Sequence, residues 1–195
     1  MESIESGSQS KNWIEQFYNF PPLFTLQPNP SSRKRQFEVW TKLLQTHCSK
    51  SNQFIITRTE ALFTNNEISR DLSEEFITEL FSYLIDNDHG VPSKGGGSPK
   101  PKSKEEKHLS GQGVDSLIFW FIPRERWYER LYEYAKTNGL QKGGIATAFE
   151  ILEDQAFTGM DERVLTILLN GMMSTRKCEV MLANDGITID GVKFF

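Results

Sequence analysis

The chain has 195 residues, of which 37% are hydrophobic and 12% aromatic, and this is enough apolar material for one or two packed domains. Its formal net charge of −4 disfavours a protein that works mainly by neutralising phosphates or anionic lipids. The longest apolar run, residues 117–122, is too short to span a bilayer, and Cys48 and Cys178 are more typical of a reducing compartment than of a disulfide framework. We therefore expect a soluble cytoplasmic protein.

The first unusual segment follows a polar stretch, residues 1–16, that we expect to be a flexible N-terminal extension. Residues 19–30, NFPPLFTLQPNP, combine prolines with apolar side chains, which neither a regular helix nor a central strand accommodates. Because a proline pushes the residue before it to extended backbone, the pattern predicts polyproline II geometry, with Phe20 and Leu23 on one edge and Phe24 beside them. Such a stiff segment loses little entropy on binding, so it can dock on a partner; alternatively, its two aromatic rings pack on their own domain.

The first half of the chain after this segment has the periodicities of a small α+β domain. In chain order, the predicted elements are a helix over residues 31–48, a strand at 54–57, a short helix near 62–68, a helix over 73–88 and a strand-loop-strand that contains residues 92–113. The helix at 73–88 is the clearest, because Ser73 is a favourable N-cap and Glu74 and Glu75 suit its first turn. Residues 92–113 are rich in Gly, Ser, Pro and Lys, so they predict a disordered loop.

The second half repeats this order of elements but not the residues. It predicts a helix with Pro123 at its first position and an end at Asn138, a strand within GGIAT, a short helix at 148–154, a helix from an Asp161 cap, and a hairpin around residues 184–186. Asp190 and Gly191 shift the apolar alternation of the last strand, as a β-bulge would. Three helices closed by a β-hairpin, twice over, predict two tandem winged-helix domains of the α+β class, at residues 17–122 and 123–195.

Three segments carry a family resemblance: FPPLFTLQPN at residues 20–29, FTGMDERVL at 157–165 and DGVKFF at 190–195. With them, the chain resembles the small subunit of the ESCRT-II endosomal sorting complex, the vacuolar protein sorting 25 family, over residues 17–195. The resemblance implies two winged-helix domains, no enzymatic activity and no cofactor.

The resemblance also implies partners. The chain would be an adaptor in a hetero-oligomer with larger ESCRT-II subunits, with two copies of this chain, in the sorting of ubiquitinated membrane cargo into multivesicular bodies. It would be cytoplasmic and peripheral on the endosomal membrane, which it would reach only through the complex. The second domain would engage an ESCRT-III subunit. The proline-aromatic box, which would contact the larger ESCRT-II subunits, consists of Phe20, Pro21, Pro22, Leu23 and Phe24.

The resemblance does not assign the ESCRT-III contact to particular residues, so charge is the remaining guide. ESCRT-III subunits begin with a basic helix, which an acidic surface of the second domain would steer. The acidic candidates for this contact are Glu150, Glu153, Asp154, Asp161 and Glu162. The alternative is that these carboxylates only form a solvated face.

Two other classes of function find less support. The alternative function is a winged-helix nucleic-acid-binding regulator, but the helix at 73–88, which would read the duplex, holds acidic residues and no Lys or Arg. The three histidines, His47, His89 and His108, are scattered, and none combines with a cysteine at metal-ligand spacing. We therefore expect no nucleic-acid partner, no metal site and no catalytic residues.

Overall fold

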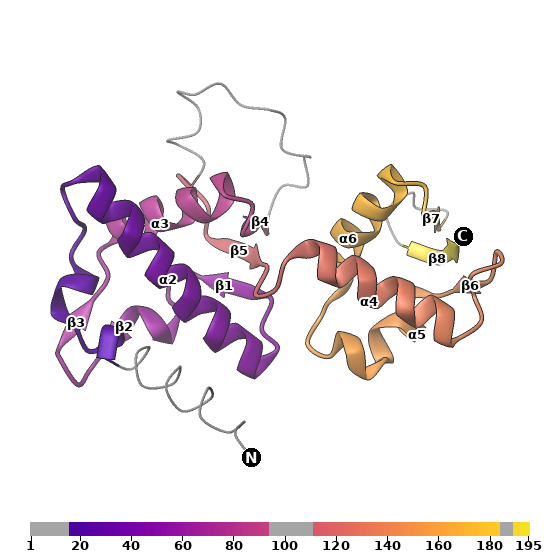
Figure 1. Ribbon diagram of the computed structural model, residues 1–195, viewed down its shortest axis with the longest axis horizontal. Coiled ribbons are helices and arrows are strands. Elements are labelled where there is room, and N and C mark those ends of the chain that lie inside the picture. The colour runs from indigo at the N-terminus through magenta and orange to yellow at the C-terminus, as the bar shows by residue number, and fades with distance from the viewer. Residues whose placement is uncertain (1–15, 94–110, 184–188) are drawn as a thin grey trace, which may run out of the picture. The chain divides into compact units, whose positions relative to one another are not determined.

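The computed structural model describes residues 16–93, 111–183 and 189–195 (Figure 1). The chain forms two compact units, one built from Met1–Cys48 and Ile55–Phe121 and the other from Ser49–Phe54 and Ile122–Phe195. Each unit combines helices with a three-stranded antiparallel sheet. The prediction of two tandem winged-helix domains of the α+β class is confirmed. Residues 1–15 of the predicted N-terminal extension and the turn of the last hairpin lie outside the described residues.

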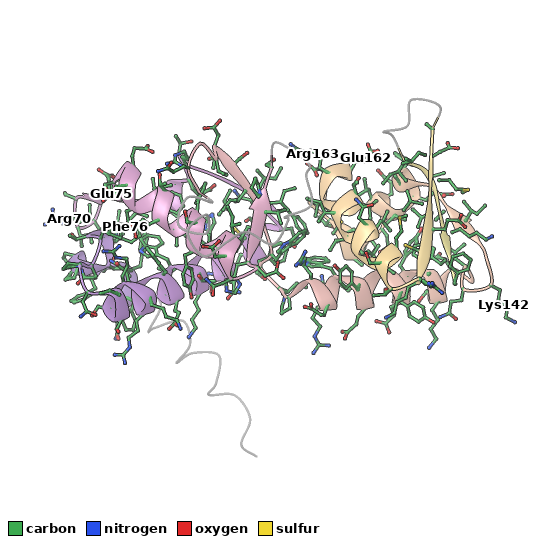
Figure 2. The ribbon with its side chains drawn as sticks, turned by 90° about the horizontal axis from the view of Figure 1, so that it is seen from above. Arg70, Glu75, Phe76, Lys142, Glu162 and Arg163 are labelled. Carbon is green, nitrogen blue, oxygen red and sulfur yellow. The ribbon has the colours of Figure 1, made fainter. Side chains whose placement is uncertain are left out.

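The first unit arranges its helices and a small sheet around one core. Its elements are the 3-10 helix η1 (Pro21–Phe24), α2 (Pro30–Ser51), β1 (Ile55–Thr57), the 3-10 helix η2 (Ala61–Phe63), β2 (Thr64–Asn65), β3 (Arg70–Asp71), α3 (Glu74–Asp86), β4 (Gly90–Pro92) and β5 (Ser116–Phe119). The sheet order is β1-β5-β4, with Ile56 opposite Leu117. Trp40 of α2 and Phe76 of α3 are fully buried with their rings 6.1 Å apart, whereas Glu75 is exposed (Figure 2).

Capping side chains confirm two predicted helix starts. Ser73 Oγ accepts a hydrogen bond from the Phe76 N–H at 3.2 Å, and Asp161 Oδ1 accepts one from the Val164 N–H at 3.0 Å at the start of α6 (Glu162–Ser174). Each cap satisfies a backbone N–H that a helix start leaves without an intrahelical partner. The helix α4 (Arg124–Thr137) begins one residue later than predicted, because the preceding proline has an extended ψ of 144°.

The prediction of a short helix near residues 62–68 is wrong. The chain there forms η2 and the small hairpin of β2 with β3. The Asn65 side chain accepts from the Glu67 N–H at 3.0 Å, and the Asn66 carbonyl accepts from the N–H of Ser69, whose φ is +52°. Asn and Ser favour such turns because their side chains offer the backbone an alternative to helical hydrogen bonds.

Both ends of the predicted 92–113 loop are ordered, so the prediction was too wide. Pro92 is the last residue of β4, and the Gly111 N–H donates to Ser82 Oγ at 2.9 Å. A Cβ atom at position 111 would lie 2.4 Å from the Thr78 carbonyl oxygen, so only glycine allows this approach to α3. The centre of the predicted loop lies outside the described residues.

The second unit follows the predicted order of elements. After α4 come β6 (Ile145–Ala146), α5 (Ala148–Glu153), the 3-10 helix η4 (Gln155–Phe157), α6, β7 (Cys178–Leu182) and β8 (Ile189–Phe194). The sheet order is β6-β8-β7. Met181 lies opposite Gly191 and Leu182 opposite Ile189, so Asp190 is an extra residue in β8. The predicted bulge is confirmed.

The two thiols are packing residues. Cys48 and Cys178 are buried and free of disulfide bonds. Burial raises the pKa of the Cys48 thiol to about 12 and that of the Cys178 thiol to about 11, so both remain protonated near neutral pH.

Among the helices of the described part, none has the length and apolar character needed to cross a membrane.

Candidate docking site

The proline-aromatic box forms a turn rather than the extended segment that its prolines predicted. Phe20 does have extended backbone, with φ −94° and ψ 108°, but Pro21–Phe24 is the 3-10 helix η1. Its bonds run from the Leu23 N–H to the Phe20 carbonyl, 2.9 Å, and from the Thr25 N–H to the Pro22 carbonyl, 3.3 Å. A helical turn leaves the N–H groups of its first residues unused, so two prolines at its start cost no hydrogen bond.

This turn separates the five predicted docking residues into two groups. Leu23 and Phe24 are buried, and Phe24 meets the rings of Trp40 and Tyr18 edge to face at 5.4 and 5.6 Å. Phe20, by contrast, is 52% exposed, and the two prolines are exposed beside it. The predicted common edge of Phe20 and Leu23 is therefore wrong. Leu23 and Phe24 therefore pack on their own domain. Phe20, Pro21 and Pro22 face outward, and we call these three residues the outward half of the box.

Two side chains of α2 form hydrogen bonds with the backbone of the box. The Gln36 Nε2 group lies 3.0 Å from the Leu23 carbonyl oxygen and 2.8 Å from that of Thr25, and the Trp40 Nε1–H donates to the Leu23 carbonyl at 3.0 Å. Gln36 is buried. Gln36 and Trp40 are four residues apart in α2, so they lie on the same face of this helix.

Tyr18, two residues before the box, is fixed by the segment at residues 62–65. The Tyr18 hydroxyl lies within hydrogen-bonding distance of the Leu62 and Thr64 carbonyl oxygens, at 3.1 and 2.9 Å. Asn65 Nδ2 donates to the Tyr18 carbonyl at 2.9 Å. Partial burial, with the nearby Glu67 carboxylate as the smaller cause, raises the pKa of Tyr18. The box is thus tied to two parts of the first domain.

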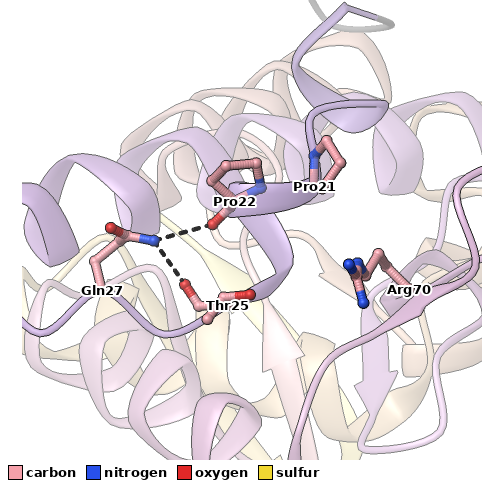
Figure 3. A pocket seen from close by; sticks show the side chains of 5 residues that line it. All are labelled: Pro21, Pro22, Thr25, Gln27 and Arg70. Atoms are coloured by element: carbon pink, nitrogen blue, oxygen red, sulfur yellow. Dashed lines mark hydrogen bonds between the residues drawn. The ribbon is translucent and has the colours of Figure 1, made fainter.

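A shallow hollow opens beside the exposed half of the box (Figure 3). It is lined by Pro21, Pro22, Thr25, Gln27 and Arg70. Gln27 Nε2 donates to the Pro22 and Thr25 carbonyls at 3.2 and 3.0 Å. Arg70, on β3, is exposed, and it takes part in none of the ion pairs described for the chain. The hollow therefore combines an apolar wall with one cation, and the sequence alone did not bring Arg70 to the box.

The acidic candidates of the second domain have mostly structural partners. Glu150 forms a capping box with Thr147, in which its carboxylate accepts from the Thr147 N–H at 2.7 Å. Hydrogen bonds from the Thr147 backbone and side chain lower the pKa of Glu150. Asp154 accepts from the Ala156 N–H at 2.9 Å, and Asp161 caps α6. These carboxylates are thus anchored at element starts rather than free.

Only some of these carboxylates lie near one another. Burial is the main cause of the raised pKa of Tyr134, and the negative charges of Glu150 and Asp154 are the smaller causes. Both carboxylates therefore lie near the Tyr134 hydroxyl. Asp161 forms an ion pair with Arg163. Glu153 is exposed, and none of the described hydrogen bonds involves its carboxylate. Glu162, the first residue of α6, accepts from the Ile189 N–H at 3.4 Å. The structure therefore brings Glu150 and Asp154 together and leaves Glu153 as the most available charge.

The helix that would read DNA in the first domain is acidic, and its neighbouring cations are engaged. Glu79 of α3 pairs with Arg33 at 2.8 Å, and Glu74 pairs with Arg58 at 3.1 Å. Burial lowers the pKa of His89, so this imidazole is neutral near pH 7. Within the described ranges, no three His, Cys, Asp or Glu side chains are arranged to hold a metal ion. The outward half of the box is the feature that points most directly to a function.

Comparisons with known proteins agree with this organisation. A family model described as ESCRT-II complex subunit matches residues 17–164. Vacuolar protein-sorting-associated protein 25 of Bos taurus is 32% identical over 187 residues, which cover 91% of this chain and 94% of that protein. The same protein of Arabidopsis thaliana is 26% identical and covers 93% of this chain and 94% of its own length.

Solved structures agree in fold. The crystal structure of subunit VPS25 of the endosomal trafficking complex ESCRT-II matches with a TM-score of 0.77 and 20% identity, over 91% of this chain and 96% of that one. A chain of the endosomal complex ESCRT-II (VPS22/VPS25/VPS36) matches with a TM-score of 0.70 and 20% identity, over the same shares. This chain therefore belongs to the vacuolar protein-sorting-associated protein 25 family of ESCRT-II complex subunits.

Proposed function

We propose that this ESCRT-II family member is a non-enzymatic adaptor that docks on the larger ESCRT-II subunits through the outward half of its proline-aromatic box. A similar chain occurs in the solved complex composed of VPS22, VPS25 and VPS36, and this supports a partner of the same kind. In this role the chain links subunits of the sorting machinery that delivers ubiquitinated membrane cargo to multivesicular bodies.

The exposure of Phe20 carries the proposal. An aromatic ring that is 52% exposed, on a turn tied down by its own domain, contributes little to folding. Insertion of such a ring into a partner pocket removes apolar surface from water, and little conformational entropy is lost because the turn is already fixed. Pro21 and Pro22, which follow Phe20 in the chain, line the hollow and add apolar surface next to it.

The hollow also indicates the chemistry of the partner surface. Its apolar wall fits aliphatic or aromatic side chains, and Arg70 fits a carboxylate at the edge of that contact. We expect the partner to present an apolar pocket with an acidic residue at its rim. Such a charge pair adds specificity, because a partner with a cation at that position would be repelled.

The decisive experiment compares two exposed phenylalanines. Phe20→Ala should weaken binding to the purified larger ESCRT-II subunits by about 2 kcal/mol or more, the loss typical of an aromatic anchor. Phe149, in α5, is 71% exposed and serves as the matched control: Phe149→Ala should bind these subunits as the unmodified chain does. Equal affinity of Phe20→Ala and the unmodified chain, measured by calorimetry, contradicts the proposal.

Copy number and membrane association belong to the same proposal. Two copies of this chain per complex would give the assembly two identical arms, and the chain would be peripheral on the endosomal membrane through its partners. Native mass spectrometry of the reconstituted complex counts the copies. Flotation with vesicles tests the second point: the isolated chain should stay with the protein fraction, and the assembled complex should move with the vesicles.

We also propose that the second domain recruits an ESCRT-III subunit. The supporting observation is the pair formed by Glu150 and Asp154 around Tyr134, with Glu153 exposed between them in sequence. A basic amphipathic helix is the chemistry that this surface fits.

A further inference from the structure

We infer that Gln36 is the positioning residue of the docking surface: its side-chain amide holds the box in the turn that presents Phe20. This inference rests on the proposed docking function. Gln36 is 6% exposed, and it is absent from the residues that line the hollow, so it acts through the box rather than on the partner.

The contacts of Gln36 define its orientation. Its Nε2 group faces the carbonyl oxygens of Pro22, Leu23 and Thr25 at 3.2, 3.0 and 2.8 Å, and its Oε1 atom accepts from the Gln27 N–H at 3.2 Å. An amide turned the other way would place Oε1 against three carbonyl oxygens. The two Nε2 hydrogens are therefore shared among three acceptors, and every polar atom of the side chain is used.

The turn needs such a donor because it makes few bonds of its own. A 3-10 helix has poorer hydrogen-bond geometry than an α-helix, and its first two residues here are prolines without N–H groups. The Leu23 carbonyl lies in a buried contact, where an unpaired acceptor is costly. Trp40 and Gln27 supply further donors, but Gln36 is the side chain that reaches all three carbonyls.

Residue 36 must therefore both fill a buried position and donate. An aliphatic side chain of equal volume would fill the space and leave the carbonyls with fewer donors. A carboxylate would fill the space and repel them. The expected consequence is a box that samples other conformations, and each such conformation lowers the fraction of molecules ready to bind.

Three measurements on the full chain test this. Gln36→Met, which preserves length and removes the donors, should bind the purified larger ESCRT-II subunits about tenfold more weakly, the loss expected for roughly one net hydrogen bond. Amide hydrogen exchange at Leu23 and Thr25 should be faster in this variant, while exchange in α3 should stay unchanged. A double-mutant cycle adds Phe20→Ala: because Gln36 acts through the box, its substitution should cost much less in that background.

The outcomes separate this inference from the docking proposal. Normal binding by Phe20→Ala overturns the docking proposal. A loss for Phe20→Ala with normal binding and normal exchange for Gln36→Met overturns only the role of Gln36, and so does full additivity in the cycle. Should Gln36→Met not fold, the unmodified chain still decides: the Gln36 side-chain amide protons should exchange more slowly than those of exposed Gln155, and equal rates overturn the inference.

Discussion

Phe20 and Phe24 lie on one short turn but in opposite environments. Phe24 is 4% exposed and packs on Trp40 and Tyr18, whereas Phe20 is 52% exposed. The two rings therefore contribute to different free energies, that of folding for Phe24 and that of association for Phe20. A variant without both rings would mix the two effects, so each ring has to be removed alone.

Phe24→Ala should lower the free energy of unfolding by about 3–5 kcal/mol, because it removes a buried ring and leaves a cavity beside Trp40. Phe20→Ala should change the same quantity by less than about 0.5 kcal/mol, as exposed positions usually do. Urea denaturation of the isolated chain measures both. Similar losses for the two variants would show that Phe20 also packs on its own domain.

Arg70 is expected to act on the rate of association. Arg70→Glu should slow binding to the larger ESCRT-II subunits by about tenfold at low salt, and the effect should fade as added salt screens the charges. The matched control is Lys142→Glu, which reverses an exposed cation of the second domain (Figure 2). Stopped-flow binding over a salt series separates them; equal slowing in both variants would indicate net charge rather than a contact at the hollow.

At the scale of elements, short helices depend on their first residues. The helix α5 spans only Ala148–Glu153, too short to be stable without its cap and its packing. Its capping box joins Thr147 and Glu150 in both directions: the Glu150 N–H donates to Thr147 Oγ1 at 3.2 Å, and the Glu150 carboxylate accepts from the Thr147 N–H. The ionised carboxylate is therefore part of the structure of α5.

This cap predicts a pH dependence. The pKa of Glu150 is lowered in the folded chain, so its contribution is fully present above the ordinary pKa of a glutamate and is lost as the pH falls through the lower folded value. An NMR titration should show the Thr147 amide signal moving together with the Glu150 carboxyl. In Thr147→Ala the midpoint should move up part of the way, because the backbone N–H remains; an unchanged midpoint would count against the capping box.

The sequence predicts helix starts well where the residue that marks the start also forms a hydrogen bond there. Ser73 and Asp161 mark helix starts because their side chains bond the first turn, and both predictions are confirmed. The β2 and β3 strands were missed because two-residue strands have no periodicity to read. The position of Pro21 before Pro22 predicts extended backbone, but the fixed φ of a proline also suits the start of a helical turn, and this second preference prevails in the box.

The docking surface was predicted only in part, for a reason of a different kind. Proline and aromatic residues marked the segment, but which ring is buried depends on Trp40, which lies on another element. A glutamine within a helix usually faces solvent, so Gln36 carried no signal of burial. Arg70 reaches the hollow only through the fold of the hairpin. Contacts between distant segments are set by packing, which local patterns do not encode.

At the scale of the whole molecule, the two domains present different surfaces. The first presents an aromatic ring, two prolines and a cation, which form the surface proposed to contact the larger ESCRT-II subunits. The second presents carboxylates, three of which are already used as caps, so a test of charge must leave those caps intact. This excludes Asp154 as a position for charge reversal, since its carboxylate bonds the Ala156 N–H.

Glu153 is the position that tests ESCRT-III recruitment cleanly. Glu153→Lys should slow association with the basic N-terminal helix of an ESCRT-III subunit roughly three- to tenfold at low salt, and dissociation should change less, because exposed charges act mainly on encounter. Binding to the larger ESCRT-II subunits should be unchanged, since that contact is proposed for the first domain. Glu38→Lys makes the same charge change on an exposed position of α2 and controls for net charge. Surface plasmon resonance at two salt concentrations measures the association rates. Identical rates for the two variants would contradict a role of Glu153 in ESCRT-III recruitment and leave the carboxylates of the second domain with a structural role alone.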